Sequence, residues 1–173
     1  MTKYFFLSLL LISLLSNCND EKKDFNPPLL IDNDKIEKKL SELKIIKDYE
    51  VGIEKSKLKK KPIILIFTAY GSVISRELEN EVILGNDSIF NILKNNYINV
   101  WLYVDDKSTD NKWSDLQVNK FKSGYQSEIF VLDTNGNKLS NGMGYSKSKK
   151  GLLPLLLDNK DIYLNYNATN QKK

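Results

Sequence analysis

The sequence predicts a mixed α/β domain, and three features support this prediction. Residues 63–67 read Ile-Ile-Leu-Ile-Phe, an uninterrupted apolar run that is typical of a strand buried on both faces of a sheet. Segments with helical spacing of apolar residues lie on either side of this run. Asn135-Gly136, between two strand-like stretches, is a strong signal for a β-hairpin. Together these features predict strands that alternate with helices.

Two helices are expected before the first strand. The first is placed at 32–47, with Asp32 available as a cap and an apolar stripe at helical spacing. The stripe consists of Ile36, Leu40, Leu43 and Ile46. It should lie against the domain or against a partner. The second helix is expected over 48–59, ahead of Pro62, although Gly52 is a poor helix former.

Two helical segments are expected after the first strand. Ser72 can cap the first of them, and an inward stripe would be formed by Ile74, Leu78 and Val82. Gly85-Asn86 should end this helix, and Asp87-Ser88 should begin another that continues through Leu93.

The rest of the chain continues the alternation. The predicted elements are a strand at 97–104, a helix at 113–122, a strand at 128–132 with a hairpin to 138–140, and a last helix at 149–166. Pro154 is expected near the first turn of that last helix, where its missing N–H does no harm. The order is therefore strand, helix, strand, helix, hairpin, helix.

Two serines stand where the first strand gives way to a helix. Residues 69–75 read Ala-Tyr-Gly-Ser-Val-Ile-Ser, which places Ser72 at a helix N-cap and Ser75 in the first turn. The segment contains no histidine or lysine that could activate either hydroxyl. We therefore interpret both serines as structural. Tyr70 and Trp113 are the aromatic residues that could line a groove here. Tyr70, in the loop, is the better candidate for an exposed groove contact, whereas Trp113 is expected in the core.

The composition restricts the chemistry of the chain. It has one cysteine, Cys18, and no histidine, so the commonest general base, metal ligand and nucleophile pairs are missing. No metal site and no cofactor are expected. Among the carboxylates, Asp105-Asp106 should cap or solvate a turn. Glu77, Glu79 and Glu81 should face water.

The first residues have the pattern of a secretory signal peptide, an apolar run after Lys3 that ends at a polar stretch. Leu-Ser-Asn-Cys at 15–18 resembles a bacterial lipobox, so 1–17 is interpreted as a lipoprotein signal peptide and Cys18 as the lipid attachment site. Residues 18–31 would then be a tether. An ordinary signal peptide with an incidental Cys18, or a signal anchor that is never cut, are the alternatives.

The charge of the chain does not indicate a nucleic-acid partner. The formal net charge is only +4, and Arg76 is the only arginine. The densest basic cluster consists of Lys57, Lys59, Lys60 and Lys61. A nucleic-acid reader would be expected to carry arginines and exposed aromatic residues along a basic stripe, so a solvated helix end is the preferred interpretation of this cluster.

Several segments between Asp48 and Tyr145 together resemble one family. They are Asp48-Tyr49-Glu50 with Gly52, Lys61-Pro62, Phe67-Thr68-Ala69-Tyr70-Gly71, Arg76 with Glu77 and Glu79, Leu102-Tyr103-Val104-Asp105-Asp106-Lys107, Asn111-Lys112-Trp113-Ser114 with Leu116-Gln117 and Phe121, Val131-Leu132-Asp133, and Gly144-Tyr145. Their order resembles the soluble thioredoxin-like domain of bacterial periplasmic thiol:disulfide interchange proteins of the cytochrome c biogenesis type.

The resemblance implies an α/β thioredoxin-like fold with a βαβαββα core at 48–166, an N-terminal helical extension at 32–47 and a polar tail at 167–173. The family's attacking and resolving cysteines correspond to Ser72 and Ser75, and its cis-proline corresponds to Ser127. A hydroxyl cannot carry out disulfide exchange. A non-proline cis bond would cost roughly 3 kcal/mol, so a trans bond is expected at Ser127.

Three functions remain open at this point. The first is a redox-inactive lipoprotein, anchored to a membrane on the periplasmic side or at the surface of the bacterial envelope, whose groove or first helix binds an envelope protein of unknown identity. The second is an oxidoreductase or accessory factor in disulfide or cytochrome maturation that uses thiols of a partner. The third is a structural, self-associating lipoprotein, which an exposed stripe on the first helix would favour.

Overall fold

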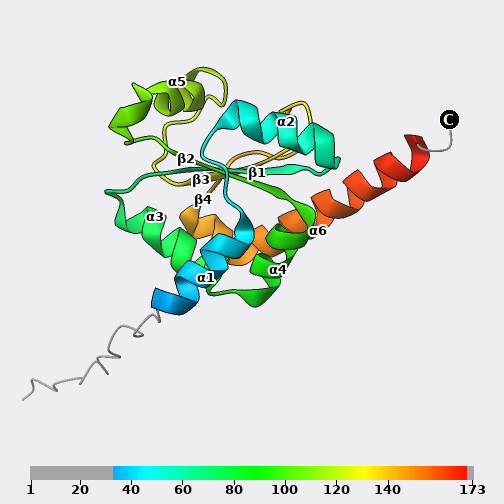
Figure 1. Cartoon of the computed structure of the whole chain (residues 1–173), viewed down its shortest axis with the longest axis horizontal. Coiled ribbons are helices and arrows are strands. Elements are labelled where there is room, and N and C mark those ends of the chain that lie inside the picture. The colour runs from blue at the N-terminus through cyan, green and yellow to red at the C-terminus, as the bar shows by residue number, and fades with distance from the viewer. Residues whose placement is uncertain (1–32, 171–173) are drawn as a thin grey trace, which may run out of the picture. The chain divides into compact units, whose positions relative to one another are not determined.

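The structure of the protein, a computed structural model, describes residues 33–170, and these lie in one compact unit, Asp32–Lys173. The predicted signal peptide, Cys18 and the predicted tether lie outside the described residues. Within them the predicted α/β class is confirmed, because helices cover a mixed sheet (Figure 1). No helix in this part of the chain is long and apolar enough to cross a bilayer.

The sheet of the described chain has four strands in the order β2-β1-β3-β4. They are β1 (Ile63–Thr68), β2 (Ile98–Tyr103), β3 (Glu128–Leu132) and β4 (Met143–Gly144). β1 pairs with β2 in parallel and with β3 antiparallel, and β3 pairs antiparallel with β4. All residues of β1 are buried, as expected of a central strand that is covered on both faces.

Helices cover both faces of the sheet (Figure 1). On one face lie α2 (Tyr49–Lys59) and α5 (Lys112–Asn119). On the other lie α1 (Asn33–Leu43), α4 (Asp87–Asn96) and α6 (Tyr145–Asn170), together with the π-helix η1 (Leu78–Leu84). A short helix, α3 (Val73–Glu77), leads from β1 into η1, and a 3₁₀ turn, η2 (Lys107–Thr109), follows β2.

Alternate residues of the central strand supply two separate cores. Ile64 and Ile66 face the layer of α1, η1, α4 and α6, where they pack with Trp101 and Leu156. Ile63, Leu65 and Phe67 face α2 and α5. Three rings, Phe67, Phe121 and Phe130, meet in this second core with centroid distances of 5.0 to 6.1 Å. The two-residue period of a strand thus accounts for both cores.

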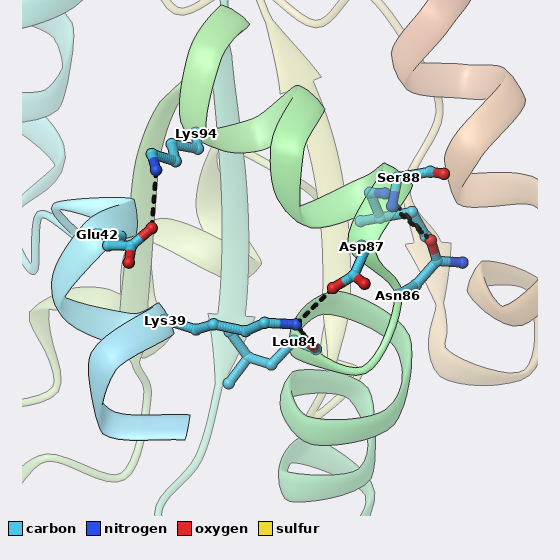
Figure 2. A network of polar contacts seen from close by, with 8 residues as sticks. Lys39, Glu42, Leu84, Asn86, Asp87, Ser88 and Lys94 are labelled. Atoms are coloured by element: carbon cyan, nitrogen blue, oxygen red, sulfur yellow. Dashed lines mark hydrogen bonds and ion pairs between the residues drawn. The ribbon is translucent and has the colours of Figure 1, made fainter. Parts of the chain in front are cut away.

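The first helix packs on the domain. Leu43 is buried, and Ile36 and Leu40 pack against the same core as α4 and η1. Figure 2 shows the polar contacts that fix it: Lys39 Nζ donates to the carbonyl of Leu84 at 2.5 Å and pairs with Asp87 at 2.8 Å. The helix ends at Leu43 rather than at residue 47, so Ile46 lies outside it and forms a bridge with Val100 instead. The apolar stripe is thus not exposed in the way that would have favoured self-association.

Some boundaries and orientations differ from the prediction. Ile74 was expected in the inward stripe but is exposed, because α3 passes into the π-helix η1 and only Leu78 and Val82 stay buried. The return strand at 138–140 is reduced to a bridge from Lys138 to Leu132, with Gly136 in the turn at φ +82°. On the edge that faces away from β1, the regular partner of β3 is β4.

The last helix begins four residues earlier than predicted and continues four residues further, through Asn170 into the segment interpreted as a polar tail. Pro154 therefore lies in the helix interior rather than in its first turn. A proline there costs about 3 kcal/mol through a lost hydrogen bond and ring crowding. Leu152 and Leu156 on either side of it are fully buried, and this burial offsets the cost.

Candidate functional site

The candidate site lies at the carboxyl end of β1, where the chain enters α3. Ser72 is the N-cap of α3, as predicted: its backbone is extended and its Oγ accepts a hydrogen bond from the N–H of Ser75 at 3.3 Å. Its side chain satisfies one of the N–H groups that the first turn of a helix leaves without a partner. Ser72 is 8% exposed.

Ser75 brings three segments together. Its Oγ accepts a hydrogen bond from the N–H of Ala69 at 3.1 Å and lies 2.7 Å from the Oγ of Ser127 and 3.2 Å from the carbonyl of Gln126. Ser127 comes from the loop before β3, far along the chain. The structure therefore places the three serines singled out in the sequence next to one another. Every described peptide bond is trans, including that at Ser127, as expected.

The surroundings of Ser75 determine what its hydroxyl can do. The residue is 0% exposed, so its oxygen does not reach the surface. Its hydrogen-bond partners among the described residues are a backbone N–H, a carbonyl and another hydroxyl. None of these groups takes up a proton at neutral pH, as the activation of a serine nucleophile requires. This arrangement holds two loops together.

A carboxyl group lies close to this cluster in the interior. Glu79 was expected to face water, but it is half-buried and its carboxylate accepts a hydrogen bond from Thr68 Oγ1 at 2.7 Å. Burial raises the pKa of Glu79, against the opposing effects of the Thr68 hydrogen bond and the charges of Lys47 and Arg76. A stripe with helical spacing could have revealed it, since Ser75, Leu78, Glu79 and Val82 are spaced i, i+3, i+4, i+7.

The loop between β1 and α3 is held by polar contacts. Both oxygens of the Asp105 carboxylate accept backbone hydrogen bonds at 2.9 Å, one from Tyr70 and one from Gly71. Arg76 donates to the carbonyl of Tyr70 at 3.1 Å. Asp105 was expected to cap or solvate a turn, and it does so at the candidate site. Its neighbour Asp106 caps the 3₁₀ turn η2.

Tyr70 is 50% exposed, as expected for a contact residue in this loop. Its ring stacks on that of Tyr103, with centroids 3.9 Å apart and planes at 10°. Lys47 Nζ lies over both rings, 5.8 Å from the centroid of Tyr70 and 5.1 Å from that of Tyr103. The two rings and the lysine form a fixed surface beside the serines. Trp113, by contrast, lies in the core.

A groove of about 580 Å³ lies on the other side of the serines. Its walls are Ile74 of α3, the segment 124–128 before and at the start of β3, and residues 142–147 around β4 and the start of α6. Ile74 is 48% exposed, and Ser127 belongs both to the groove and to the serine cluster. The sequence predicted a groove at this place but not its walls, because these come from three distant segments. Tyr70, expected as a contact in the groove, is not among the residues that line it.

The wall of the groove contains a second buried carboxyl group. In the part of the chain that the structure describes, Glu128 Oε2 has no hydrogen-bond partner. Burial raises the pKa of Glu128, although the charge of Lys138 opposes this. The other oxygen, Oε1, lies where a side chain at Gly142 would be, so Gly142 gives the carboxyl group its space.

Comparison with protein-family models and with curated proteins found no match to this chain. Between residues 33 and 170 there is no group of three or more acidic, cysteine or histidine side chains that could hold a metal ion. The geometry of the site is therefore what indicates its chemistry. Cys18, the predicted lipid attachment site, lies outside the described residues.

Proposed function

We propose that this chain is a thioredoxin-like domain without thiol chemistry that acts as a protein-binding module in the bacterial envelope. The observation that carries the proposal is the position of Ser75, whose hydroxyl is fully buried and bonded to Ala69 and Ser127. At this place a redox enzyme of the family would need a thiol. Ser75 stands at that position, but its hydroxyl holds the structure together and carries out no thiol chemistry.

The order of elements supports the thioredoxin-like fold. From β1 onward the chain runs strand, helix, strand, helix, two antiparallel strands and a helix, with the serines at the start of the first of these helices. Ser127 precedes β3 and meets Ser75 directly, which is the relation that the resemblance implies for the residue in the cis-proline position. The resemblance implies a cis-proline here, whereas the bond at Ser127 is trans, and we expect this difference to alter the wall of the groove.

The groove supports a binding function. It combines the exposed apolar side chain of Ile74 with polar backbone at 124–128 and at the sheet edge, where β4 pairs on one side only. An extended segment of a partner could form backbone hydrogen bonds there while one of its side chains packs on Ile74. The first helix is not available for this role, because its apolar side lies in the core.

The location in the envelope is supported by the N-terminal sequence. The run after Lys3 and the Leu-Ser-Asn-Cys sequence at 15–18 resemble those of a lipoprotein precursor. Lipid chains on Cys18 would hold the domain at a membrane, at roughly 0.8 kcal/mol per buried methylene. A partner of the groove would then be another protein of the envelope.

The test is capture of the tagged full chain from cross-linked native envelopes, compared between two variants. Ile74→Glu places a charge in the groove, whereas Val118→Glu places one at a similarly exposed site on α5, 52% against 48% exposed. A partner that is recovered with the parent and with Val118→Glu, but lost with Ile74→Glu, supports the proposal. Equal recovery of the partner with both variants would show that the groove is not its binding site. Insulin reduction by the parent chain above a buffer control would overturn its non-catalytic part.

A further inference from the structure

A second cavity lies away from the serines and is surrounded by lysines. It measures about 400 Å³, and its lining includes Lys44, Lys55, Lys59, Lys61 and Lys94. These residues come from the turn after α1, from α2, from the entry to β1 and from α4. The sequence showed only the local cluster near residue 60, which was interpreted as a solvated helix end. Of that cluster, only Lys59 and Lys61 line the cavity, and the fold brings Lys44, Lys55 and Lys94 to them.

The charge in this lysine cavity is only partly balanced. Glu42 is the one acidic residue of the lining, and it pairs with Lys94 at 2.7 Å (Figure 2). Five positive charges less one negative leave a formal +4. Lys61 donates to the carbonyl of Asn95. Within the described chain, no carboxylate lies at ion-pair distance from Lys44, Lys55 or Lys59.

Helix ends at the cavity provide the simplest alternative explanation of the lysines. α1 ends at Leu43, α2 at Lys59 and α4 at Asn96, and the carboxyl end of a helix attracts cations. Each end carries only about half a negative charge, so the three together amount to roughly −1.5. The carbonyls of Leu43 and Leu93 are moreover already bonded to Asn99 Nδ2, at 3.1 and 3.2 Å. The helix ends therefore leave most of the positive charge unbalanced.

We propose that the lysine cavity binds a phosphate monoester. Such a group carries between one and two negative charges near neutral pH and accepts several hydrogen bonds, which suits point-charge donors such as lysine ammonium groups. The cavity is large enough for a small phosphorylated molecule or for one lipid headgroup. A nucleic acid fits it poorly, since the site is a concave pocket without arginine. This site is separate from the groove and does not depend on the proposed function.

The experiment uses the full chain and two sources of the same group, with neutral detergent present in the first arm only. In the first arm, glycerol 3-phosphate and inorganic phosphate are titrated at constant ionic strength, and backbone amide shifts are followed. In the second, binding to phosphatidylcholine vesicles with and without phosphatidic acid is measured. Saturable binding of glycerol 3-phosphate identifies a soluble ligand, whereas selective binding to phosphatidic acid vesicles alone identifies a headgroup. The absence of both overturns the proposal.

Matched variants separate this cavity from the general charge of the surface. Lys55→Gln with Lys59→Gln removes two lining charges, and Lys107→Gln with Lys150→Gln removes two from exposed positions outside it. One charge-assisted hydrogen bond corresponds to roughly a tenfold change in affinity, so the first pair should weaken binding about tenfold or more. Equal weakening by the second pair overturns the proposal. If the first pair of substitutions prevents folding, the amide shifts of the parent chain test the proposal. The proposal requires that these shifts centre on Lys44, Lys94 and Asn99.

Discussion

The hydroxyl of Ser75 makes contacts that join three segments of the chain. Its oxygen accepts a hydrogen bond from the N–H of Ala69, and its proton can be donated to the carbonyl of Gln126. A third hydrogen bond joins it to the hydroxyl of Ser127, in which either oxygen can be the donor. Removing the hydroxyl leaves buried polar groups without a partner, which costs more than the hydrogen bond itself contributes. The residue is therefore expected to matter for stability.

Ser75→Ala should lower the free energy of unfolding by about 1 to 3 kcal/mol, because the N–H of Ala69 and the hydroxyl of Ser127 lose their partner in the interior. Urea denaturation measures this. Ser72→Ala is the matched control, and the loss of its N-cap should cost about 1 kcal/mol. A cost for Ser75→Ala below that of the control would contradict the role given to Ser75.

Restoring thiols at both positions tests the relation to redox enzymes. In Ser72→Cys/Ser75→Cys, the thiol at position 72 should react with an alkylating reagent first, since Ser72 is 8% exposed and Ser75 is 0% exposed. The two thiols should also form a reversible disulfide on mild oxidation. Mass spectrometry after alkylation reports both results. Equal reactivity of the two thiols, with no disulfide, would count against the thioredoxin-like geometry.

At the scale of elements, the sequence predicted most of what local patterns determine. β1, α2, the Ser72 cap and β3 follow from an apolar run, a cap and the spacing before Pro62. What it missed depends on tertiary contacts. The interior Pro154 is tolerated because its neighbours are buried, and the exposure of Ile74 depends on the passage of α3 into η1.

Gly52 illustrates the same point inside a helix. Because glycine is a poor helix former, it made the second helix a weaker prediction, yet it lies within α2. An added Cβ at this position would collide with Val100 of β2. The glycine lets the helix approach the sheet closely. The packing of the helix on the sheet outweighs the low helix propensity of glycine. The sequence of the helix alone does not reveal this packing.

Gly52→Ala should therefore destabilise the fold by about 1 to 3 kcal/mol, because the clash with Val100 outweighs the better helix propensity of alanine. Val100→Ala, made alone and together with Gly52→Ala, completes a double-mutant cycle in chemical denaturation. The double variant should lose less than the sum of the single losses. Additive losses would show that the two residues do not interfere.

At the scale of the whole molecule, the candidate site lies where strands of the sheet meet elements of one helical layer. The serines, Glu79 and the groove are supplied by the end of β1, by α3 and η1, by the start of β3 and by β4 with α6. The sequence predicted the three serines and Tyr70 as site residues. It placed Glu79 in water, although the stripe that Glu79 forms with Ser75, Leu78 and Val82 pointed inward. It did not predict Glu128, since the burial of that carboxyl group depends on tertiary packing.

The stability of the whole domain should depend on the ionisation of Glu79. Burial raises the pKa of Glu79 in the folded state. As the pH rises, the unfolded chain therefore loses this proton at a lower pH than the folded chain does. The contribution of Glu79 to the free energy of unfolding is thus fully present at acidic pH, and it is lost as the pH rises through the folded-state pKa. Glu79→Gln should remove this loss while it can still accept the Thr68 hydrogen bond.

Urea midpoints measured from about pH 4 to about pH 7 test this, since that interval begins near the unperturbed glutamate pKa. Glu81→Gln is the control with the opposite sign, because a hydrogen bond from Lys149 lowers the pKa of Glu81 and favours its charged form. Parallel curves for the parent and Glu79→Gln would contradict the burial of an ionisable carboxyl group at this position.

The most direct test of the proposed binding function is site-specific photo-cross-linking in native envelopes. A photoreactive amino acid replaces Ile74 in one variant of the full chain and Val118, on the opposite face of the sheet, in the other. The proposal predicts a discrete adduct with one envelope protein from position 74 and none from position 118. No adduct at position 74, or the same adducts at both positions, would contradict a binding groove beside the serines.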